Sequence, residues 1–223
     1  MRRLAAASIA IGAIAPVVLT AQLTTPSDWK WRQDAPAPLA AGSKMEPGSW
    51  VFVQMPPGWH VTTGPAVLLY PMVHGEASGN FSVDAEIFLF PESSAEEYGI
   101  FLGASSIEGP QPAEYTAFVL RRDGQAAVLH RRQNTSTAVV NWQAHDAIVP
   151  QKGGGDAVKN MLRVDLDQAT ATMTVNGAKV LSVPRDSVKT DGRFGFRIGR
   201  DVNLHISALN VTRKLAPQPA LKK

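Results

Sequence analysis

The sequence predicts an all-β protein built as one antiparallel sandwich of two sheets. Apolar residues recur at alternate positions in short runs, which is the period of a half-buried strand. Turn residues separate these runs, and the 223-residue chain contains 18 glycines and 16 prolines. No long helical stripe is present, and parallel strand pairs would need crossover helices. We therefore expect the strands to pair antiparallel, with short turns between them.

The stretch from Asn80 to Phe90 is the clearest strand. One face carries Phe81, Val83, Ala85, Ile87 and Leu89, and the other carries Ser82, Asp84, Glu86, Phe88 and Phe90. The first face is predicted to lie against the core. The second face mixes polar and aromatic side chains.

Residues 114 to 132 are predicted to form a hairpin that turns at Asp123-Gly124, a dipeptide that tolerates the positive φ angles of a two-residue type I′ turn. A two-residue turn pairs Arg122 with Gln125 and fixes the register of both strands. The apolar face is then predicted to hold Phe118, Leu120, Ala127 and Leu129. The opposite face is predicted to hold Tyr115, Arg121, His130 and Arg132.

Further alternating runs follow in the last third of the chain. A second hairpin joins residues 171–175 to residues 178–183 through Asn176-Gly177, which is again a strong turn signal. Apolar residues also alternate over 162–166, 194–198 and 202–206. About 160 residues of such strands fit one sandwich better than two separate domains.

Four segments are expected along the chain. Residues 1–21 are typical of a signal peptide, because Met1-Arg2-Arg3 precedes an apolar run and small residues follow it. Residues 22–47 are rich in proline and alanine and are predicted to form an extended arm. Trp29 and Trp31 in this arm would anchor it to the domain, or stack on a ligand. Residues 48–213 would form the sandwich, and residues 214–223 a basic tail.

Composition excludes several classes of function. The chain has no cysteine, so disulfides, thiolate metal sites and thiol nucleophiles are excluded. The two arginines of the leader carry part of the formal charge of +3, and their removal leaves +1. This leaves no dense basic face, so nucleic acid is not an expected partner. No stable membrane span is expected once the leader has been removed.

Three stretches resemble the last strands of concanavalin A-like jelly-roll domains. They are Asn160-Met-Leu-Arg-Val-Asp-Leu-Asp, the Thr-Val-Asn-Gly hairpin and Gly192-Arg-Phe-Gly-Phe-Arg-Ile-Gly. Laminin G-like and 3-keto-disaccharide hydrolase-type members of this superfamily have similar strands in the same order. Earlier stretches, such as Tyr98-Gly-Ile-Phe-Leu-Gly, are also similar. The resemblance covers roughly residues 48 to 212 and implies a jelly-roll sandwich.

The polar face of the first hairpin is the predicted ligand-binding site. Because this fold hosts lectins, glycanases, lyases and adhesion modules, function has to be argued from the site itself. Tyr115 offers an aromatic face for a sugar ring, and His130 offers hydrogen-bonding groups for its hydroxyls. Arg121 and Arg132 would suit a uronate. Trp142 and His145 are candidates for the rim, or Trp142 clamps a loop. A solvated strand face is the alternative.

Asp84 and Glu86 are the candidate catalytic residues. Glucanases of this fold share a Glu-x-Asp-x-x-Glu strand, and Asp84-Ala-Glu86 is its nearest match, without the third acid. These two carboxylates could instead bind a structural calcium ion, to which Asp201 and Asn203 would add ligands. The five histidines have no compact ligand spacing, so no zinc centre or other cofactor is predicted.

These observations predict a periplasmic or secreted domain that binds a carbohydrate or glycan without catalysis. One alternative is an enzyme that cleaves glycosidic bonds, either a glycoside hydrolase similar to the 3-keto-disaccharide hydrolases or a related lyase. Another alternative is an adhesion or scaffold module of the cell envelope, which contacts another protein through a sheet edge or the arm.

Overall fold

The computed structural model describes residues 26–34, 50–109, 111–132 and 135–214. Within these ranges all paired strands are antiparallel and form two sheets, which confirms the predicted all-β sandwich. The expected signal peptide lies outside the described residues, as do most of the arm and all but the first residue of the basic tail. In the described ranges, no helix is long and apolar enough to cross a bilayer.

Sheet A has eight strands. Its order is β1 (Trp29–Gln33), β4 (Val67–Pro71), β14 (Gly192–Ile198), β7 (Tyr98–Ser105), β8 (Glu114–Leu120), β9 (Gln125–Arg132) and β10 (Thr135–Ala144), and β5 (Glu76–Ala77) also pairs with β14.

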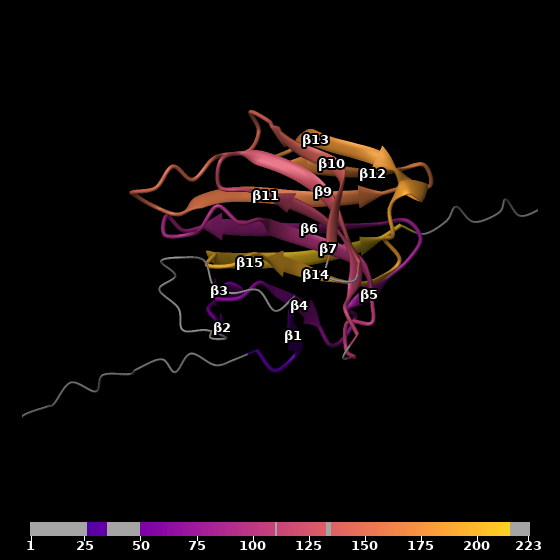
Figure 1. Cartoon of the computed structure of the whole chain (residues 1–223), viewed down its shortest axis with the longest axis horizontal. Coiled ribbons are helices and arrows are strands. Elements are labelled where there is room, and N and C mark those ends of the chain that lie inside the picture. The colour runs from indigo at the N-terminus through magenta and orange to yellow at the C-terminus, as the bar shows by residue number, and fades with distance from the viewer. Residues whose placement is uncertain (1–25, 35–49, 110, 133–134, 215–223) are drawn as a thin grey trace, which may run out of the picture.

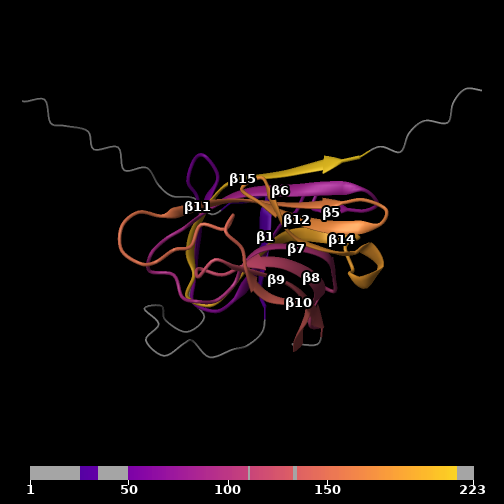
Figure 2. The ribbon, with the colours of Figure 1, turned by 90° about the horizontal axis from the view of Figure 1, so that it is seen from above.

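Sheet B has seven strands and covers the inner face of sheet A. Its order is β13 (Ala178–Pro184), β12 (Thr170–Val175), β11 (Val158–Leu166), β6 (Phe81–Leu89), β15 (Asn203–Arg213), β3 (Trp59–Thr63) and β2 (Trp50–Gln54). A short 3₁₀ helix, η1 (Arg185–Ser187), follows β13. Strands of sheet B run across Figure 1, and Figure 2 shows β6 and β15 in one layer and β8, β9 and β10 in the other.

The main core lies between the two sheets. The apolar face predicted for residues 80–90 is confirmed, because Phe81, Val83, Ala85, Ile87 and Leu89 are all buried in it. Apolar residues of β14 and β7 face it from sheet A. Strand alternation therefore sends Arg193, Gly195 and Arg197 of β14 to the outer face of sheet A.

Residues 22–47, which were predicted to form an extended arm, include one strand of the sandwich. Residues 29–33 form β1, which pairs with β4 as an edge strand of sheet A. Trp29 is buried in the main core, where its ring packs edge-on against Trp59 with 4.9 Å between centroids. Burial of this large side chain explains why residues 29–33 join the sheet although prolines flank them in the sequence. Trp29 therefore anchors this segment to the domain, which was one of the two roles expected for it.

The register predicted for the first hairpin is also wrong, by one residue. Leu120 pairs with Ala126, and the Arg121 N–H donates to the Gln125 carbonyl oxygen, so the loop has three residues instead of two. Gly124 has a positive φ of 88°, and the Asp123 carboxylate accepts a hydrogen bond from the Gln125 N–H. These features fit a turn that ends in a glycine bulge. A register shift of one residue moves each side chain of β9 to the other face relative to β8.

Candidate functional site

The outer face of sheet A carries a second apolar cluster. Its buried members come from β4, β7, β8 and β9, and from the segment that joins β7 to β8. They are Leu68, Tyr70, Phe101, Ala104, Ile107, Ala113, Tyr115, Ala117, Val119 and Ala127, with Leu129 and Trp142 packed against them. The centre of this face is thus filled by the protein's own side chains. Polar side chains gather at its two ends.

A charged hollow of about 330 Å³ lies at one end of this face. It is lined by three arginines, three carboxylates and two small residues, namely Arg131, Arg197, Arg200, Asp34, Glu96, Glu97, Ala66 and Ser136. These residues come from segments far apart in the sequence. We refer to this set as the charged hollow.

Arg197 is the central cation of the charged hollow. It projects from β14, and its side chain is only 8% exposed. Its Nε lies 2.7 Å from Oδ2 of Asp34, and its Nη2 lies 3.0 Å from Oε1 of Glu97. Burial acts to lower the pKa of Arg197, but the negative charges of Asp34 and Glu97 outweigh it, and the net direction is upward. Arg197 therefore remains charged and holds both carboxylates in place.

Asp34 links β1 to this network. Its N–H donates to the Ala66 carbonyl oxygen, which continues the pairing of β1 with β4 beyond the strand ends. The Asp34 carbonyl oxygen accepts a hydrogen bond of 2.9 Å from Nη2 of Arg131. The side-chain Oδ1 of Asp34 lies 3.8 Å from Arg131 Nε. Asp34 thus joins Arg131 of β9 to Arg197 of β14. The N-terminal segment completes the charged hollow as well as the sheet.

The most accessible pair of the hollow is Glu96 with Arg200. Their side chains are 28% and 29% exposed, and Arg200 Nη2 donates to Glu96 Oε1 over 2.6 Å. Gly199 brings the two loops together, because a Cβ there would lie 2.5 Å from the Cβ of Glu96. The Thr63 hydroxyl donates to the Gly199 carbonyl oxygen and accepts from the Val202 N–H, which fixes the turn that carries Arg200.

This arrangement suits recognition of hydroxyl groups. Each guanidinium presents several N–H donors in a fixed plane, and each carboxylate presents acceptors. Because the arginines and the carboxylates hold each other, little reorganisation is needed when a ligand enters. Charges of the two signs are equal in number, so the hollow has no net preference for an anion or a cation.

The structure divides the predicted ligand-binding face of the first hairpin. Tyr115 is buried in the outer cluster at 1% exposure, with its ring centroid 5.5 Å from that of Phe101. Across from it lies Arg131, whereas His130 pairs with Thr116 and so points to the other face. The prediction that Tyr115, Arg121, His130 and Arg132 share one face is therefore wrong. The three-residue turn is the reason.

Tyr115 nevertheless borders the charged network. Burial raises the pKa of the Tyr115 hydroxyl, and Asp34 raises it further, whereas Arg197 and Arg131 act in the opposite direction. The net pKa is well above the ordinary tyrosine value, so this hydroxyl stays protonated. Its place is under the hollow, where it hydrogen-bonds to the Asp34 side chain.

His130 and Arg132 lie apart from the hollow. Nε2 of His130 is 3.4 Å from Oε1 of Glu114, and Arg132 is exposed at the end of β9 next to Thr135. Arg121 shares the outer face with Tyr115, but its guanidinium lies 3.8 Å from the ring centroid of Trp142. This cation–π contact fixes Trp142 against the outer cluster. Trp142 belongs to strand β10 and packs against the outer cluster, and it is not among the residues that line the charged hollow.

His145 lies in the turn that follows β10. Its Nδ1 accepts a hydrogen bond of 3.1 Å from the Ala147 N–H, so the proton of the neutral ring is on Nε2. The side chain is partly exposed and shapes this turn. It is not among the residues that line the charged hollow.

Asp84 and Glu86 lie on the outer face of sheet B. Asp84 Oδ1 accepts a hydrogen bond of 2.6 Å from Arg163, and Glu86 Oε2 lies 3.3 Å from Lys159 Nζ. Both partners belong to the neighbouring strand β11. The two carboxylates therefore sit in ion pairs on the opposite side of the molecule from the charged hollow.

The four oxygen ligands considered for calcium do not converge. Asp84 pairs with Asn210 on β15, whereas Asn203 is the first residue of that strand. Asn203 and Asn210 are seven residues apart on this strand, which corresponds to about 23 Å at about 3.3 Å per residue. One ion cannot contact both pairs, so these four residues do not form a single calcium site. In the part of the chain that the structure describes, no cluster of three or more acidic or histidine side chains suits a metal.

The residues of the charged hollow were not among the candidate site residues predicted from the sequence. One signal was present, because Arg193 and Arg197 alternate with Phe194, Phe196 and Ile198 in a strand whose apolar face was recognised. Both arginines must then face away from the main core. No local pattern marked Asp34, which follows β1 in a segment rich in proline. Its role depends on a contact with Arg197, 163 positions later in the numbering of the chain.

Comparisons with known proteins identify the fold. The carbohydrate-binding module CBM66 from Bacillus subtilis aligns with a TM-score of 0.57 and 9% identity, over 82% of this chain and 95% of that chain. A protein of unknown function from Bacillus subtilis with a galectin-like fold gives 0.52 and 12%, over 83% and 89%. The alginate lyase A1-II′ gives 0.51 and 17%, over 84% and 95%.

No family model matches the sequence, and no curated protein matches it. The structural neighbours are jelly-roll sandwiches of the concanavalin A-like superfamily, which confirms the resemblance seen in the sequence. At these identities the likeness is one of fold.

Proposed function

We propose that this protein is an exported carbohydrate-binding domain, which holds the hydroxyl groups of a neutral sugar in the charged hollow without catalysis. The observation that carries the proposal is the convergence of three arginines and three carboxylates around one hollow of about 330 Å³. Sugar-binding sites need a few fixed donors and acceptors in a concave place. The similarity in fold to a carbohydrate-binding module supports the same assignment.

The balance of charge supports a neutral ligand. An anionic sugar would approach Asp34, Glu96 and Glu97, and a cation would approach the three arginines. A hydroxyl group accepts from a guanidinium and donates to a carboxylate, so it uses both kinds of group at once. Neutral polyhydroxy compounds therefore match the hollow best.

The state of Tyr115 supports binding over catalysis. An efficient general base has a pKa near the working pH, whereas burial moves the pKa of Tyr115 upward. Asp84 and Glu86, the alternative catalytic pair, already form ion pairs with Arg163 and Lys159, respectively. The leader-like residues 1–21 support export to the periplasm or beyond.

Calorimetric titration with neutral oligosaccharides chosen from a glycan array tests the proposal. We expect a saturable response that Arg200→Gln weakens by about tenfold, because one charged hydrogen-bonding partner is lost. Arg163→Gln is the matched control, since Arg163 also pairs with carboxylates but lies on sheet B. No binding by the wild-type protein, or equal binding by Arg200→Gln, would refute the proposal.

A further inference from the structure

A second hollow of about 300 Å³ lies at the other end of the outer face of sheet A. It is lined by Glu76, Ala104, Ser105, Ser106, Ile107, Glu108, Gly109 and Arg193. Arg193 and Arg197 are four residues apart on β14 and share its outer face, so the two hollows are separated by about 13 Å along the strand. Phe101 and Tyr70 of the outer cluster belong to the same face.

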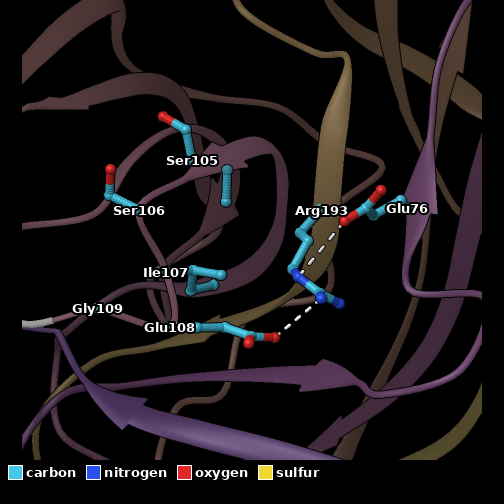
Figure 3. Close-up of a pocket in the computed structure, with 8 residues that line it drawn as sticks. Glu76, Ser105, Ser106, Ile107, Glu108, Gly109 and Arg193 are labelled. Carbon is cyan, nitrogen blue, oxygen red and sulfur yellow. Dashed lines mark ion pairs between the residues drawn. The ribbon is translucent and has the colours of Figure 1, made fainter.

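Arg193 is the cation of the second hollow. Figure 3 shows its guanidinium between two carboxylates, with Nη2 2.8 Å from Oε1 of Glu108 and Nε 3.6 Å from Oε1 of Glu76. The guanidinium also lies 5.8 Å from the ring centroid of Tyr70. The Glu76 side chain is 67% exposed and makes the longer of the two contacts. A ligand can therefore replace Glu76 without disturbing a buried group.

The wall of the second hollow is held by Arg32 of β1. Its Nη1 lies 2.9 Å from the carbonyl oxygen of Ser106 and 3.2 Å from that of Ile107, and it also contacts the carbonyl oxygens of Gly109 and Gln111. In a planar trans peptide the N–H points opposite to the C=O. The N–H groups of Ile107 and Glu108 therefore point away from Arg32. Arg32 presets the conformation of this wall.

Basic residues outnumber acidic ones around this wall. The basic side chains that contact the lining residues or their carbonyl oxygens are Lys30, Arg32, Lys189, Arg193 and Arg213, and the acidic side chains that they meet are Glu76, Glu108 and Glu114. The charged hollow, in contrast, has equal numbers of both. The lining of the hollow itself holds Arg193 with the two carboxylates Glu76 and Glu108, so an anionic group gains from the surrounding positive charge when it takes the place of Glu76.

We propose that the second hollow binds a carboxylate or sulfate group of an acidic saccharide. The group accepts hydrogen bonds from Arg193 in place of Glu76, and a planar guanidinium suits the paired oxygens of such anions. Ser105 and Ser106 also line this hollow, and the Ser105 hydroxyl accepts a hydrogen bond of 2.9 Å from Lys189 (Figure 3). This site is separate from the charged hollow, so it does not rest on the proposed function.

The test is an NMR titration of the protein with sodium glucuronate and, in separate arms, with a sulfated monosaccharide and inorganic sulfate. We expect saturable shifts at Arg193 and at residues 105–109 that weaken as the salt concentration rises. Arg193→Gln should lower the affinity by about tenfold, whereas Arg163→Gln on sheet B should leave it unchanged. Response to sulfate alone, without a response to either saccharide, would contradict a saccharide site.

Glu76→Gln keeps the test decisive if Arg193→Gln fails to fold. It removes the carboxylate that competes for Arg193 from an exposed position, so the anions should bind more tightly, by about threefold. Unchanged or weaker binding by Glu76→Gln would overturn the proposal, as would binding by Arg193→Gln at the wild-type affinity. A neutral oligosaccharide titrated in parallel reports on the charged hollow, so failure of one site is distinguished from failure of the other.

Discussion

The outer faces of the two sheets contain the same kinds of residue in opposite surroundings. Arg197 on sheet A is 8% exposed and contacts two carboxylates, whereas Arg163 on sheet B is 40% exposed and also contacts two, Asp84 and Asp165. Exposed ion pairs contribute little to stability, but a buried charge that loses its partner is costly. Position in the fold thus decides which ion pair is part of a site.

Replacing the buried arginine should have the largest effect. Arg197→Met leaves Asp34 and Glu97 without their cation, and we expect it to lower the free energy of unfolding by about 3 to 5 kcal/mol. Arg163→Met on sheet B should lower it by less than about 1 kcal/mol. Urea denaturation of both variants measures the difference. Equal losses would mean that the two faces do not differ as described.

Apolar residues should show the same contrast with a somewhat smaller effect. Leu68 is completely buried in the outer cluster of sheet A, whereas Met161 on the outer face of sheet B is 42% exposed. We expect Leu68→Ala to cost about 3 kcal/mol and Met161→Ala to cost less than about 1 kcal/mol. If thermal and chemical denaturation show a small loss for Leu68→Ala, the outer cluster does not act as a second core.

Histidine titration on sheet B should have a modest effect that depends on pH. Burial lowers the pKa of His60 below 6.5, and the neighbouring His205 lowers it further. His60 in the unfolded chain then binds a proton more readily than His60 in the folded protein. Its contribution to the free energy of unfolding is therefore complete above about pH 6.5 and is lost as the pH falls from there towards the lower pKa of the folded protein. His60→Gln should make the urea midpoint of unfolding less dependent on pH between about pH 7.5 and 5.5. The same slope in the variant would exclude His60 as its source.

The smallest effect on sugar binding is expected at Glu86, one of the two candidate catalytic residues. Glu86 lies on the face opposite the charged hollow and pairs with Lys159. Glu86→Gln should therefore bind a neutral oligosaccharide with unchanged affinity in a calorimetric titration. If the wild-type protein instead releases reducing sugar from disaccharides and Glu86→Gln does not, the protein is an enzyme and its active site lies on sheet B.

Two hairpins show how far the sequence predicts this fold. At Asn176-Gly177 both residues have positive φ, and Val175 pairs with Ala178, as a two-residue turn requires. At Asp123-Gly124 only the glycine does, and the loop has three residues, with a hydrogen bond from the Gln125 N–H to the Asp123 side chain. Strand alternation predicted the fold in both cases. The register depended on the length of the turn.

The charged hollow was harder to predict than the fold. Alternation placed Arg193 and Arg197 away from the main core, but it did not indicate that this outer face is itself buried. The pairing of Asp34 with Arg197 depends on β1 joining the sheet, which the burial of Trp29 brings about. Contacts between distant segments of this kind leave no mark in a local pattern.

The most direct test of the account is an NMR titration with a neutral oligosaccharide that follows the Nε–H signals of the arginines. We predict that the signals of Arg131, Arg197 and Arg200 shift together as the hollow fills, while that of Arg163 does not move. Shifts confined to Arg163 and its neighbours on sheet B would place the sugar on the opposite face. That result would contradict the account.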